Sequence, residues 1–461
     1  MENEKSEKKG VRLNTVRVIA LGFFGVIFVG AVLLWLPICN TSPIAFIDAL
    51  FTSTSAVCVT GLVTIVPATQ FTLLGKIILL LLIQIGGLGV IAVTLGIMVM
   101  IHKKITVRER VMIQQTYNMD NLSGMVKFLI RVIKGTFFAE LLGAILYATI
   151  FVPEFGLVTG IGYSVFHSVS AFCNAGIDIL GSSSFMPYVT NPVINVTTMI
   201  LIVTGGLGFT VWYEVRANVI KNVKEKSPKK RIFTRLSLHA KIVLVMTAAL
   251  LGIGTVGFFL FEYFNPGTIG NLTFGQKIMA SMFQSVTTRT AGFATISQAN
   301  LSQASKLLGC ILMIIGGSPG GTAGGVKTTT IAMLLFTCIC EIKGKPQTEC
   351  FGRRIVASIV RTGIVIVTIT VMILLLGTML ITIFEPGKDF LDIFFETASA
   401  IGTVGLTADL TTTLSRASHI VLIAMMYIGR IGPITMALVL GGKTDKLSGL
   451  VDLPESRIIV G

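Results

Sequence analysis

Charged residues are scarce in this sequence, and their scarcity excludes a water-soluble protein. Only 13% of the 461 residues are charged, whereas 53% are hydrophobic and the mean hydropathy is +0.84. A soluble surface of this size needs more charge. Five runs are long and apolar enough to cross about 30 Å of hydrocarbon as helices: 18–36, 77–101, 194–211, 242–261 and 362–384. The sequence therefore predicts an all-α, multi-pass protein of the cell membrane.

Residues that hold metals or perform nucleophilic chemistry are also few. The four histidines are scattered along the chain: His102, His167, His239 and His419. The seven cysteines show no paired metal-ligand spacing, because Cys338 and Cys340 stand alone as C-x-C in an apolar run. We therefore expect no zinc site, no disulfide framework, no cofactor in this chain and no enzymatic activity.

Acidic residues are outnumbered by basic ones, 22 to 37, which gives a net charge of +15. A basic protein can bind nucleic acid, but here the positive residues alternate with the apolar spans. Five segments hold 29 of the 37 Lys and Arg residues: 1–17, 102–134, 216–241, 341–361 and 443–461. Five connections hold none: 37–47, 62–72, 151–165, 177–193 and 262–276. Because positive loops are cytoplasmic in membrane proteins, both termini are predicted to be cytoplasmic, and no nucleic-acid partner is expected.

One short motif occurs four times at nearly equal spacing. The copies are FTSTSAVCVTG, FHSVSAFCNAG, FQSVTTRTAG and FETASAIGTVG, which end at Gly61, Gly176, Gly292 and Gly405. These glycines are 115, 116 and 113 residues apart, which indicates tandem repeats. In the third copy, the interval from the phenylalanine to the glycine is one residue shorter than in the others.

Each repeat contains a long apolar span, a segment of about 12 residues that is too short to cross a membrane, the glycine, and a second long span. The short segments are 44–57, 161–172, 274–288 and 390–401. We predict that they are pore helices that enter from the external side. Irregular backbone at membrane depth must line a wet cavity. The predicted fold is therefore four tandem membrane-pore-membrane repeats with pseudo-fourfold symmetry around one ion pore.

Backbone oxygens are predicted to select a monovalent cation in this pore. The pore helices direct C-terminal carbonyls with about half a negative charge toward the axis, and the glycine loops carry no carboxylate suited to a divalent ion. Rings of carbonyls replace the hydration shell of potassium, and glycine permits the dihedrals that this needs. The predicted filter residues are Val59, Thr60, Gly61, Asn174, Ala175, Gly176, Thr290, Ala291, Gly292, Thr403, Val404 and Gly405. The side chains of Thr60, Asn174, Thr290 and Thr403 either line the ion path or cap the pore helices.

These motifs resemble the potassium-translocating subunits of the Trk, Ktr and HKT superfamily, over essentially the whole chain. Thr403-Val404-Gly405 and Thr60-Gly61 are similar to shortened potassium-channel filters, and four glycines are typical of the potassium-selective members. The first span leads directly into the first pore helix, without the two additional spans of the Trk type, so the chain resembles the Ktr type. The resemblance implies potassium uptake across the cytoplasmic membrane, with potassium as the transported ion and sodium as an activator.

The resemblance also implies partners. It predicts a homodimer with one pore per protomer, bound to a cytoplasmic ring of nucleotide-binding (KtrA-like) regulatory subunits that gates it. The basic segments 102–134, 216–241 and 341–361 either dock this ring or face anionic lipid of the bilayer. The alternative function is a proton- or sodium-coupled secondary cation transporter built on inverted repeats, although the four repeats run in parallel.

A glycine-rich stretch interrupts the second span of the third repeat. Residues 316–327 read GGSPGGTAGGVK, and no helix continues through them because each Gly costs about 1 kcal/mol and Pro about 3. Family resemblance implies a movable barrier below the filter. The predicted gate residues are Gly316, Gly317, Gly320, Gly321, Gly324, Gly325, Lys327 and Arg430. A phosphate-binding loop is the rival interpretation, but Val326 separates the last glycine from Lys327, and apolar spans flank the stretch.

Arg430 lies among apolar residues, where insertion costs about 2.5 to 3.5 kcal/mol. It is either a hydrogen-bonding partner of loop carbonyls or a positive charge that gates cations, and Lys327 has the same two interpretations. We attribute the pairs Gly86-Gly87 and Gly205-Gly206 to close helix packing.

The predicted division of the chain follows the motifs. It consists of a cytoplasmic segment (1–16), repeat 1 (17–110), repeat 2 (111–235), repeat 3 (236–350) with a gating loop at 316–330, repeat 4 (351–445) and a cytoplasmic segment (446–461).

Overall fold

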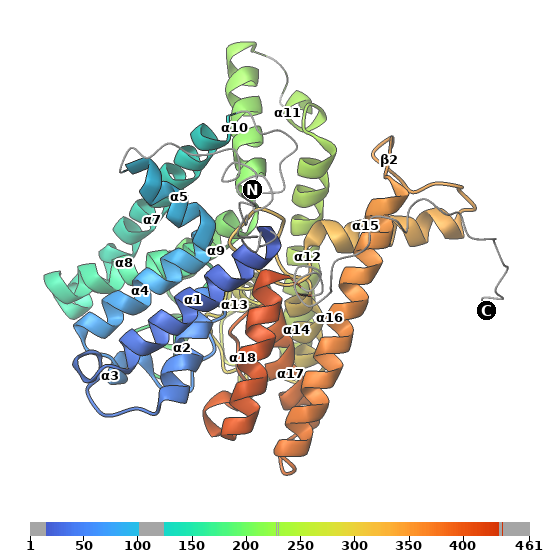
Figure 1. Cartoon of the computed structure of the whole chain (residues 1–461). Helices are drawn as coiled ribbons and strands as arrows, with labels where there is room; N and C mark the ends of the chain where they lie inside the picture. Colours follow the sequence, from blue (N-terminus) through green and yellow to red (C-terminus); the bar gives the residue numbers. More distant parts are fainter. Residues whose placement is uncertain (1–14, 101–123, 227, 229, 433–435, 437–461) are drawn as a thin grey trace, which may run out of the picture.

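The secondary structure of the computed structural model is almost entirely helical (Figure 1). It describes residues 15–100, 124–226, 228, 230–432 and 436. The predicted cytoplasmic segments 1–16 and 446–461 therefore lie outside the described residues, apart from Thr15 and Val16. Among the described residues the strands β1 (Glu349–Cys350) and β2 (Arg353–Arg354) form one short antiparallel hairpin. The all-α prediction is confirmed for this part of the chain.

Four of the described helices are long and apolar enough to cross a membrane. They are α1 (Thr15–Trp35), α7 (Met125–Phe155), α12 (Leu238–Glu262) and α16 (Ala357–Phe384). At most a third of the most apolar window of each helix is buried within the protein. The remaining surface is rich in Leu, Ile and Phe, as at Leu21 and Phe24 of α1, which water would solvate poorly. Lipid is therefore the solvent that these helices require.

A shorter helix follows each long one and packs against it. These helices are α2 (Phe46–Cys58), α8 (Leu157–Phe172), α13 (Phe274–Thr287) and α17 (Phe390–Gly402). Their bounds lie within four residues of the short segments predicted from the sequence.

The second apolar span is interrupted in the first two quarters of the chain, which corrects the prediction of continuous spans at 77–101 and 194–211. Gly89, with a φ of 88°, separates α4 (Leu73–Leu88) from α5 (Val90–Met100). A bend of 101° separates α9 (Pro192–Gly206) from α10 (Phe209–Lys224), with Gly208 at a φ of 91°. Positive φ ends a right-handed helix, and glycine adopts it without a steric cost.

The second span of the third quarter is interrupted as well, and that of the fourth is described as far as Gly432. The 316–327 loop separates α14 (Gln303–Ile314) from α15 (Thr328–Ile342), and α18 (Arg416–Ile431) ends at Gly432, with a φ of 96°. Short helices complete the connections: η1 (Pro37–Cys39), α3 (Pro67–Gln70), η2 (Met186–Tyr188), α11 (Lys230–Thr234) and η3 (Thr411–Thr413).

Side-chain caps determine where the second spans begin. The first helix of each, α4, α9, α14 and α18, starts at a residue whose side chain accepts a hydrogen bond from an N–H of the first turn. These residues are Thr72, Asn191, Ser302 and Ser415. Such a cap contributes about 1 kcal/mol, so the chain leaves each preceding loop at a defined residue.

The four quarters close into a ring. In chain order, α4 contacts α8, α9 contacts α13, α14 contacts α17, and α18 returns to α2. Figure 1 shows the red α18 beside the blue α1 and α2. The Tyr427 hydroxyl of α18 donates a hydrogen bond to the carbonyl of Ala20 in α1 over 2.8 Å. The glycine loops, which follow α2, α8, α13 and α17, are thereby brought to one centre.

Candidate ion-permeation site

The four motif glycines are neighbours in a closed ring. A Cβ added to Gly61 would lie 3.1 Å from the Cα of Gly405 and 3.4 Å from the carbonyl carbon of Gly176. A Cβ on Gly176 would lie 2.6 Å from the Cα of Gly292, and one on Gly292 would lie 3.3 Å from the Cα of Gly405. At each position the backbone of another loop occupies the space that a side chain needs.

The backbone conformation repeats in all four glycine loops (59–61, 174–176, 290–292 and 403–405). The glycines have φ values of 106°, 63°, 84° and 95°, in chain order. The residue two positions earlier also has positive φ in each case: Val59 at 56°, Asn174 at 61°, Thr290 at 68° and Thr403 at 52°. Residues with a Cβ rarely adopt this region. The third loop therefore keeps the register of the others, despite its shorter interval.

The turn at the end of each predicted pore helix (α2, α8, α13 and α17) explains how the third loop omits a residue. In three loops a backbone N–H bonds to a carbonyl five residues earlier over 2.8 Å: Thr60 to Ser55, Ala175 to Ser170 and Val404 to Ser399. In the third, the N–H of Ala291 bonds to the carbonyl of Thr287, four residues earlier, over 3.0 Å. A tighter turn thus compensates for the missing residue.

A hydroxyl near the end of each pore helix holds its own glycine loop. Ser55 and Ser399 accept hydrogen bonds from the N–H groups of Gly61 and Gly405, each over 3.0 Å. Ser170 and Thr287 instead donate to the carbonyls of Ile177 and Phe293, each over 2.6 Å. These four residues were not predicted from the sequence. The signal available was a hydroxyl residue at the same place in every motif.

In three of the four quarters of the chain, the side chain directly after the motif phenylalanine is hydrogen-bonded to the segment that follows the glycine. His167 Nε2 accepts from the N–H of Ile179 over 3.4 Å, and Gln284 Nε2 donates to Gln298 Oε1 over 2.6 Å. Glu396 accepts from the N–H of Ala408 over 3.1 Å and from a threonine hydroxyl, that of Thr411, over 2.7 Å. These side chains are fully buried, and their role was also missed.

Two of the predicted polar filter residues are not helix caps. The hydroxyls of Thr60 and Thr403 are buried and have no hydrogen-bond partner within the described residues. A cap would bond to the backbone, and a buried hydroxyl left unsatisfied costs about 1 to 3 kcal/mol. The Asn174 amide lies 3.4 Å from the hydroxyl of Thr290. With its amide oxygen and nitrogen exchanged, Asn174 donates to the carbonyls of Ala171 and Phe172 over 3.3 Å, so it caps its helix, whereas Thr60 and Thr403 do not.

A vestibule of about 380 Å³ opens at one end of the glycine ring and is lined by all four glycines. Asp178 and Asp409 also line it, whereas no Lys or Arg does. Carboxylates around a concave mouth raise the local concentration of cations. Neither aspartate was predicted, although Asp178 follows Gly176 by two residues.

The 316–327 loop lies against another part of the ring. A Cβ on Gly324 would overlap the Thr403 hydroxyl, and Thr322 Oγ1 donates to the carbonyl of Phe172 over 3.2 Å. The bend between α9 and α10 holds the loop, because Ser318 N–H bonds to Gly206 O over 2.9 Å. Thr322 N–H bonds to Gly205 O over 3.1 Å, and Phe209 N–H bonds to Gly320 O over 3.1 Å. The structure therefore brings the predicted gate residues of this loop next to the predicted filter.

Basic side chains anchor the same loop through its carbonyls. Arg430 donates to the carbonyls of Thr322 and Gly86, and so connects the loop to α4. Lys327 Nζ donates to the carbonyl of Ala323 over 2.7 Å. Arg289, buried and not predicted to act here, donates to the carbonyl of Gly316 over 3.3 Å. Bonding to loop carbonyls, one of the two interpretations of Arg430 and Lys327, is therefore observed.

Small residues let the second spans pass directly beside the pore helices. A Cβ on Gly86, Gly205 or Gly429 would overlap the carbonyl of the pore helix beside it, at Val57, Phe172 or Ile401 respectively. The packing interpretation of Gly86 and Gly205 is confirmed.

These features define a class of protein: a multi-pass helical membrane protein in which short helices converge on a narrow ring of backbone, as in proteins that move ions. The sequence model of the TrkH family, described as cation transport protein, matches residues 5–445. The chain belongs to this family, so it is a cation transporter and not an enzyme.

Individual relatives agree with the family. The chain is 38% identical over 453 residues to the Ktr system potassium uptake protein B of Bacillus subtilis (strain 168), covering 98% of both chains. It is also 38% identical over 455 residues to the potassium/sodium uptake protein NtpJ of Enterococcus hirae, again covering 98% of both. Its fold is similar to the crystal structure of the potassium transporter TrkH from Vibrio parahaemolyticus, with a TM-score of 0.70, 20% identity, and coverage of 95% of this chain and 87% of that one. The resemblance to the Ktr type is confirmed.

Proposed function

We propose that this protein takes up potassium through one pore formed by four membrane-pore-membrane repeats with pseudo-fourfold symmetry: 17–110, 111–235, 236–350 and 351–445. The observation that carries the proposal is the closed ring of Gly61, Gly176, Gly292 and Gly405. Glycine loops ordered around one point offer carbonyls to a dehydrated monovalent cation. The names of the relatives from Bacillus subtilis and Enterococcus hirae, which mention potassium uptake, favour potassium as the ion.

The filter in this proposal consists of the twelve residues of the glycine loops (59–61, 174–176, 290–292 and 403–405). The repeated positive φ values and the unpartnered hydroxyls of Thr60 and Thr403 support this role. The vestibule with Asp178 and Asp409 supplies cations to the filter.

The gate is the loop at 316–330, with its glycines at 316, 317, 320, 321, 324 and 325. Its closed state is stabilised by Arg430 and Lys327, which occupy the carbonyls that the loop would otherwise expose. Opening breaks these bonds and moves the loop away from Thr403.

Both termini are cytoplasmic in this proposal, since most Lys and Arg residues lie in alternate connections. The protein acts as a homodimer, and a cytoplasmic ring of nucleotide-binding, KtrA-like subunits opens the gate. Sodium stimulates transport. The similarity to Ktr system proteins supports this arrangement.

Rubidium uptake into vesicles that contain the purified protein tests the function. We expect uptake that follows the rubidium gradient, that potassium inhibits and that a proton gradient does not drive. Flux that requires a proton or sodium gradient would instead establish a coupled secondary transporter.

A further inference from the structure

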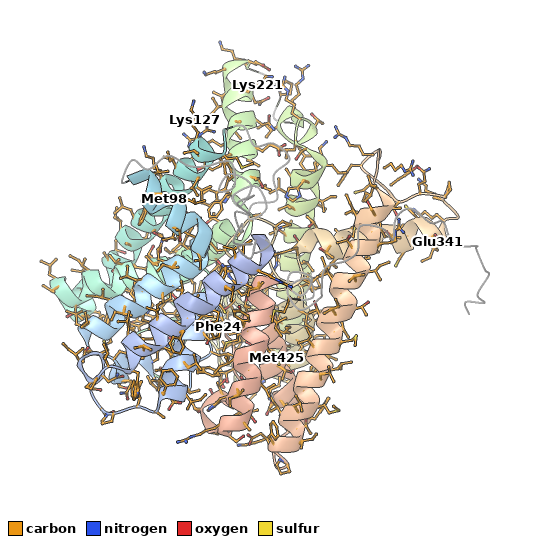
Figure 2. All side chains as sticks on the ribbon, viewed as in Figure 1. Phe24, Met98, Lys127, Lys221, Glu341 and Met425 are labelled. Carbon is orange, nitrogen blue, oxygen red and sulfur yellow. The ribbon has the colours of Figure 1, made fainter. Side chains whose placement is uncertain are left out.

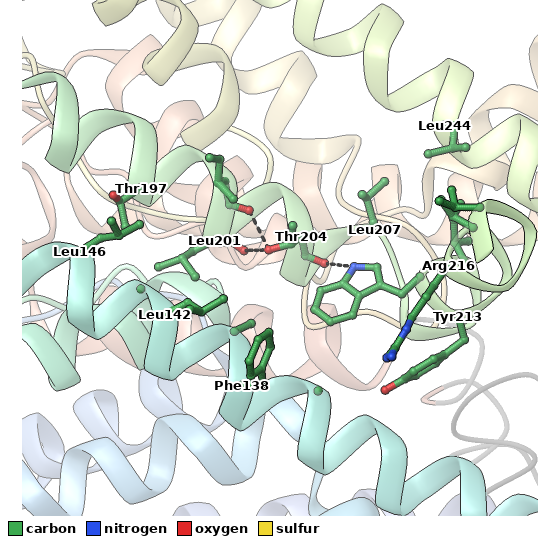
Figure 3. Close-up of a pocket in the computed structure, with 18 of the residues that line it drawn as sticks. Phe138, Leu142, Leu146, Thr197, Leu201, Thr204, Leu207, Tyr213, Arg216 and Leu244 are labelled. Atoms are coloured by element: carbon green, nitrogen blue, oxygen red, sulfur yellow. Dashed lines mark hydrogen bonds between the residues drawn. The ribbon is translucent and has the colours of Figure 1, made fainter. Parts of the chain in front are cut away.

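An apolar crevice of about 730 Å³ lies on the outer surface of the second quarter, between α7, α9 and α10 (Figure 3). Phe138, Leu142 and Leu146 of α7 form one wall, and these side chains are 63%, 48% and 45% exposed. Leu201 and Thr204 of α9 belong to the opposite wall. No helix of the described chain covers these side chains, so the crevice faces lipid or a binding partner.

The crevice has the length of one lipid leaflet. It extends along α7 from Gly135 to Leu146, which corresponds to roughly 16 Å at 1.5 Å per residue. Half of a hydrocarbon core is about 15 Å. An acyl chain of one leaflet therefore matches the crevice from end to end.

One end of the crevice is basic. A second hollow shares Tyr213 and Arg216 with it and adds Arg131 and Lys134. Figure 3 shows Arg216 and Tyr213 at one end of the crevice and Leu142 and Leu146 toward the other. The Tyr213 hydroxyl donates to the carbonyl of Arg131 over 2.6 Å, which fixes α7 against α10 at this point.

No carboxylate neutralises this end within the described residues. No Asp or Glu lines either hollow, and neither Arg131, Lys134 nor Arg216 belongs to an ion pair found in the described chain. Glu214, the acidic residue nearest in sequence to Arg216, accepts a hydrogen bond from the Ser237 hydroxyl over 2.8 Å. The end is thus complementary to an anion.

The basic end lies on the side of the molecule assigned to the cytoplasm. Arg131 and Lys134 are in the first three turns of α7, and Arg216 begins the most basic connection of the chain. Figure 2 shows Lys127 and Lys221, from the same two helices, at one end of the molecule. Basic pockets between membrane helices on the cytoplasmic side bind anionic lipid headgroups.

We infer that this crevice binds one anionic diacyl phospholipid of the cytoplasmic leaflet. Its phosphate contacts Arg131, Lys134 and Arg216, and one acyl chain lies along Phe138, Leu142 and Leu146. Two other occupants fit less well. A free phosphate ion would contact the basic end but leave the apolar walls of the crevice uncovered. A lipid without net charge would cover the walls but leave the charges of the three basic side chains uncompensated.

The two tryptophans of the chain provide a direct test. Trp212 lines the crevice, whereas Trp35 is at the far end of α1 and 50% exposed. The Trp35→Phe variant is placed in nanodiscs of phosphatidylcholine. A minor fraction of the lipid carries brominated chains, which quench tryptophan fluorescence. This brominated lipid is phosphatidylglycerol in one sample and phosphatidylcholine in the other. We expect brominated phosphatidylglycerol to quench Trp212 at lower mole fractions. The Trp212→Phe variant reports Trp35, which both lipids should quench equally.

Charge variants test the headgroup contacts. Adding Arg216→Gln to Trp35→Phe should lower the apparent affinity for phosphatidylglycerol about five-fold, the factor that corresponds to about 1 kcal/mol per basic residue at an anionic surface. Arg216→Lys should retain the preference. Lys224→Gln, on the same helix but outside both hollows, is the matched control and should leave it unchanged. Arg131→Gln replaces Arg216→Gln if the latter does not yield folded protein.

Three results would overturn the inference. Equal quenching of Trp212 by both brominated lipids would show that no anionic lipid is selected. Equal losses in Arg216→Gln and Lys224→Gln would show a general surface charge effect. Absence of quenching by either lipid would show that protein, such as a second copy of the chain, covers the crevice.

Discussion

The glycine ring and the 316–327 loop are both glycine-rich and lie next to each other, yet they are held in different ways. In each quarter a side chain of the short helix bonds to its own glycine loop or to the residue directly after it, as with Ser399 and Gly405. The 316–327 loop is bonded within its own quarter, through Lys327 and Arg289, but also to other quarters of the chain, through the carbonyls of Gly205 and Gly206 and through Arg430. A movement of α9 or α18 therefore disturbs the loop without breaking the internal bonds of the ring. This difference suits a fixed filter beside a movable gate.

Replacing a ring glycine should produce the largest effect. In Gly405→Ser the new Cβ would lie 2.7 Å from the Cα of Gly61, at a φ of 95° that serine rarely adopts. We expect the preference for potassium over sodium to fall about ten-fold or more, which corresponds to about 1.4 kcal/mol of lost discrimination. The preference is measured from how strongly potassium and sodium each inhibit rubidium uptake. Gly176→Ser should lower the preference in the same way.

Gly162→Ser is the matched control for this change. Gly162 lies in the pore helix α8, and a Cβ there meets nothing within 4 Å. It should retain the preference for potassium. If Gly405→Ser also retained it, these loops would not be the filter.

Arg430→Gln should affect the gate and spare the filter. It removes charge-assisted bonds from the carbonyls of Thr322 and Gly86, each of which contributes about 1.5 to 3 kcal/mol. Rubidium flux without any regulatory subunit should rise about ten-fold, as expected for a net change of about 1.4 kcal/mol, with unchanged selectivity. Arg416→Gln, at the exposed start of the same helix, is the control and should change neither the rubidium flux nor the selectivity. A loss of selectivity in Arg430→Gln would show that ring and loop are not separable.

The sequence was sufficient to predict the four short helices and the glycine loops that follow them, because their signals are local: a repeated motif and apolar segments of a given length. It did not reveal that Ser55 and Ser399 hold the loops. Which hydroxyl of a Ser- and Thr-rich helix faces a loop depends on the rotation of the helix in the packed protein. The breaks at Gly89 and Gly208 were missed for a related reason, since a glycine in a membrane span is compatible with close packing and with a break.

The vestibule is a further feature that depends on tertiary structure. Asp178 and Asp409 follow their glycines by two and four residues, so no common spacing relates them. They line one cavity only because the loops after Gly176 and Gly405 fold toward each other. Arg430 of the fourth quarter contacts Thr322 of the third and Gly86 of the first. No local sequence pattern predicts contacts between residues so far apart in the chain.

Removing a single hydroxyl should weaken the ring less than adding a side chain does. Ser399→Ala leaves the N–H of Gly405 without its acceptor, a loss of about 1 kcal/mol or more. We expect selectivity for potassium to fall about five-fold, as that energy implies. Thr397→Val, on the same helix, removes a buried hydroxyl that bonds to Thr378 instead, so it should lower the melting temperature and leave selectivity intact. If both variants lost selectivity equally, general loosening of α17 would be the cause.

The smallest effect should come from the two aspartates of the vestibule, which belong to neither the glycine ring nor the 316–327 loop. Asp178→Asn removes one of the two carboxylates that line the open vestibule, where the field that attracts cations is largely screened beyond about 10 Å at 0.1 M salt. The concentration of rubidium for half-maximal uptake should therefore rise about two-fold at low ionic strength and hardly at all at high ionic strength. Glu341→Gln, at the end of α15 and not in the lining of the cavity, should leave this half-maximal concentration unchanged at both ionic strengths. A change in selectivity would instead mean that Asp178 acts on the filter itself, so that the ring depends on groups beyond its own pore helices.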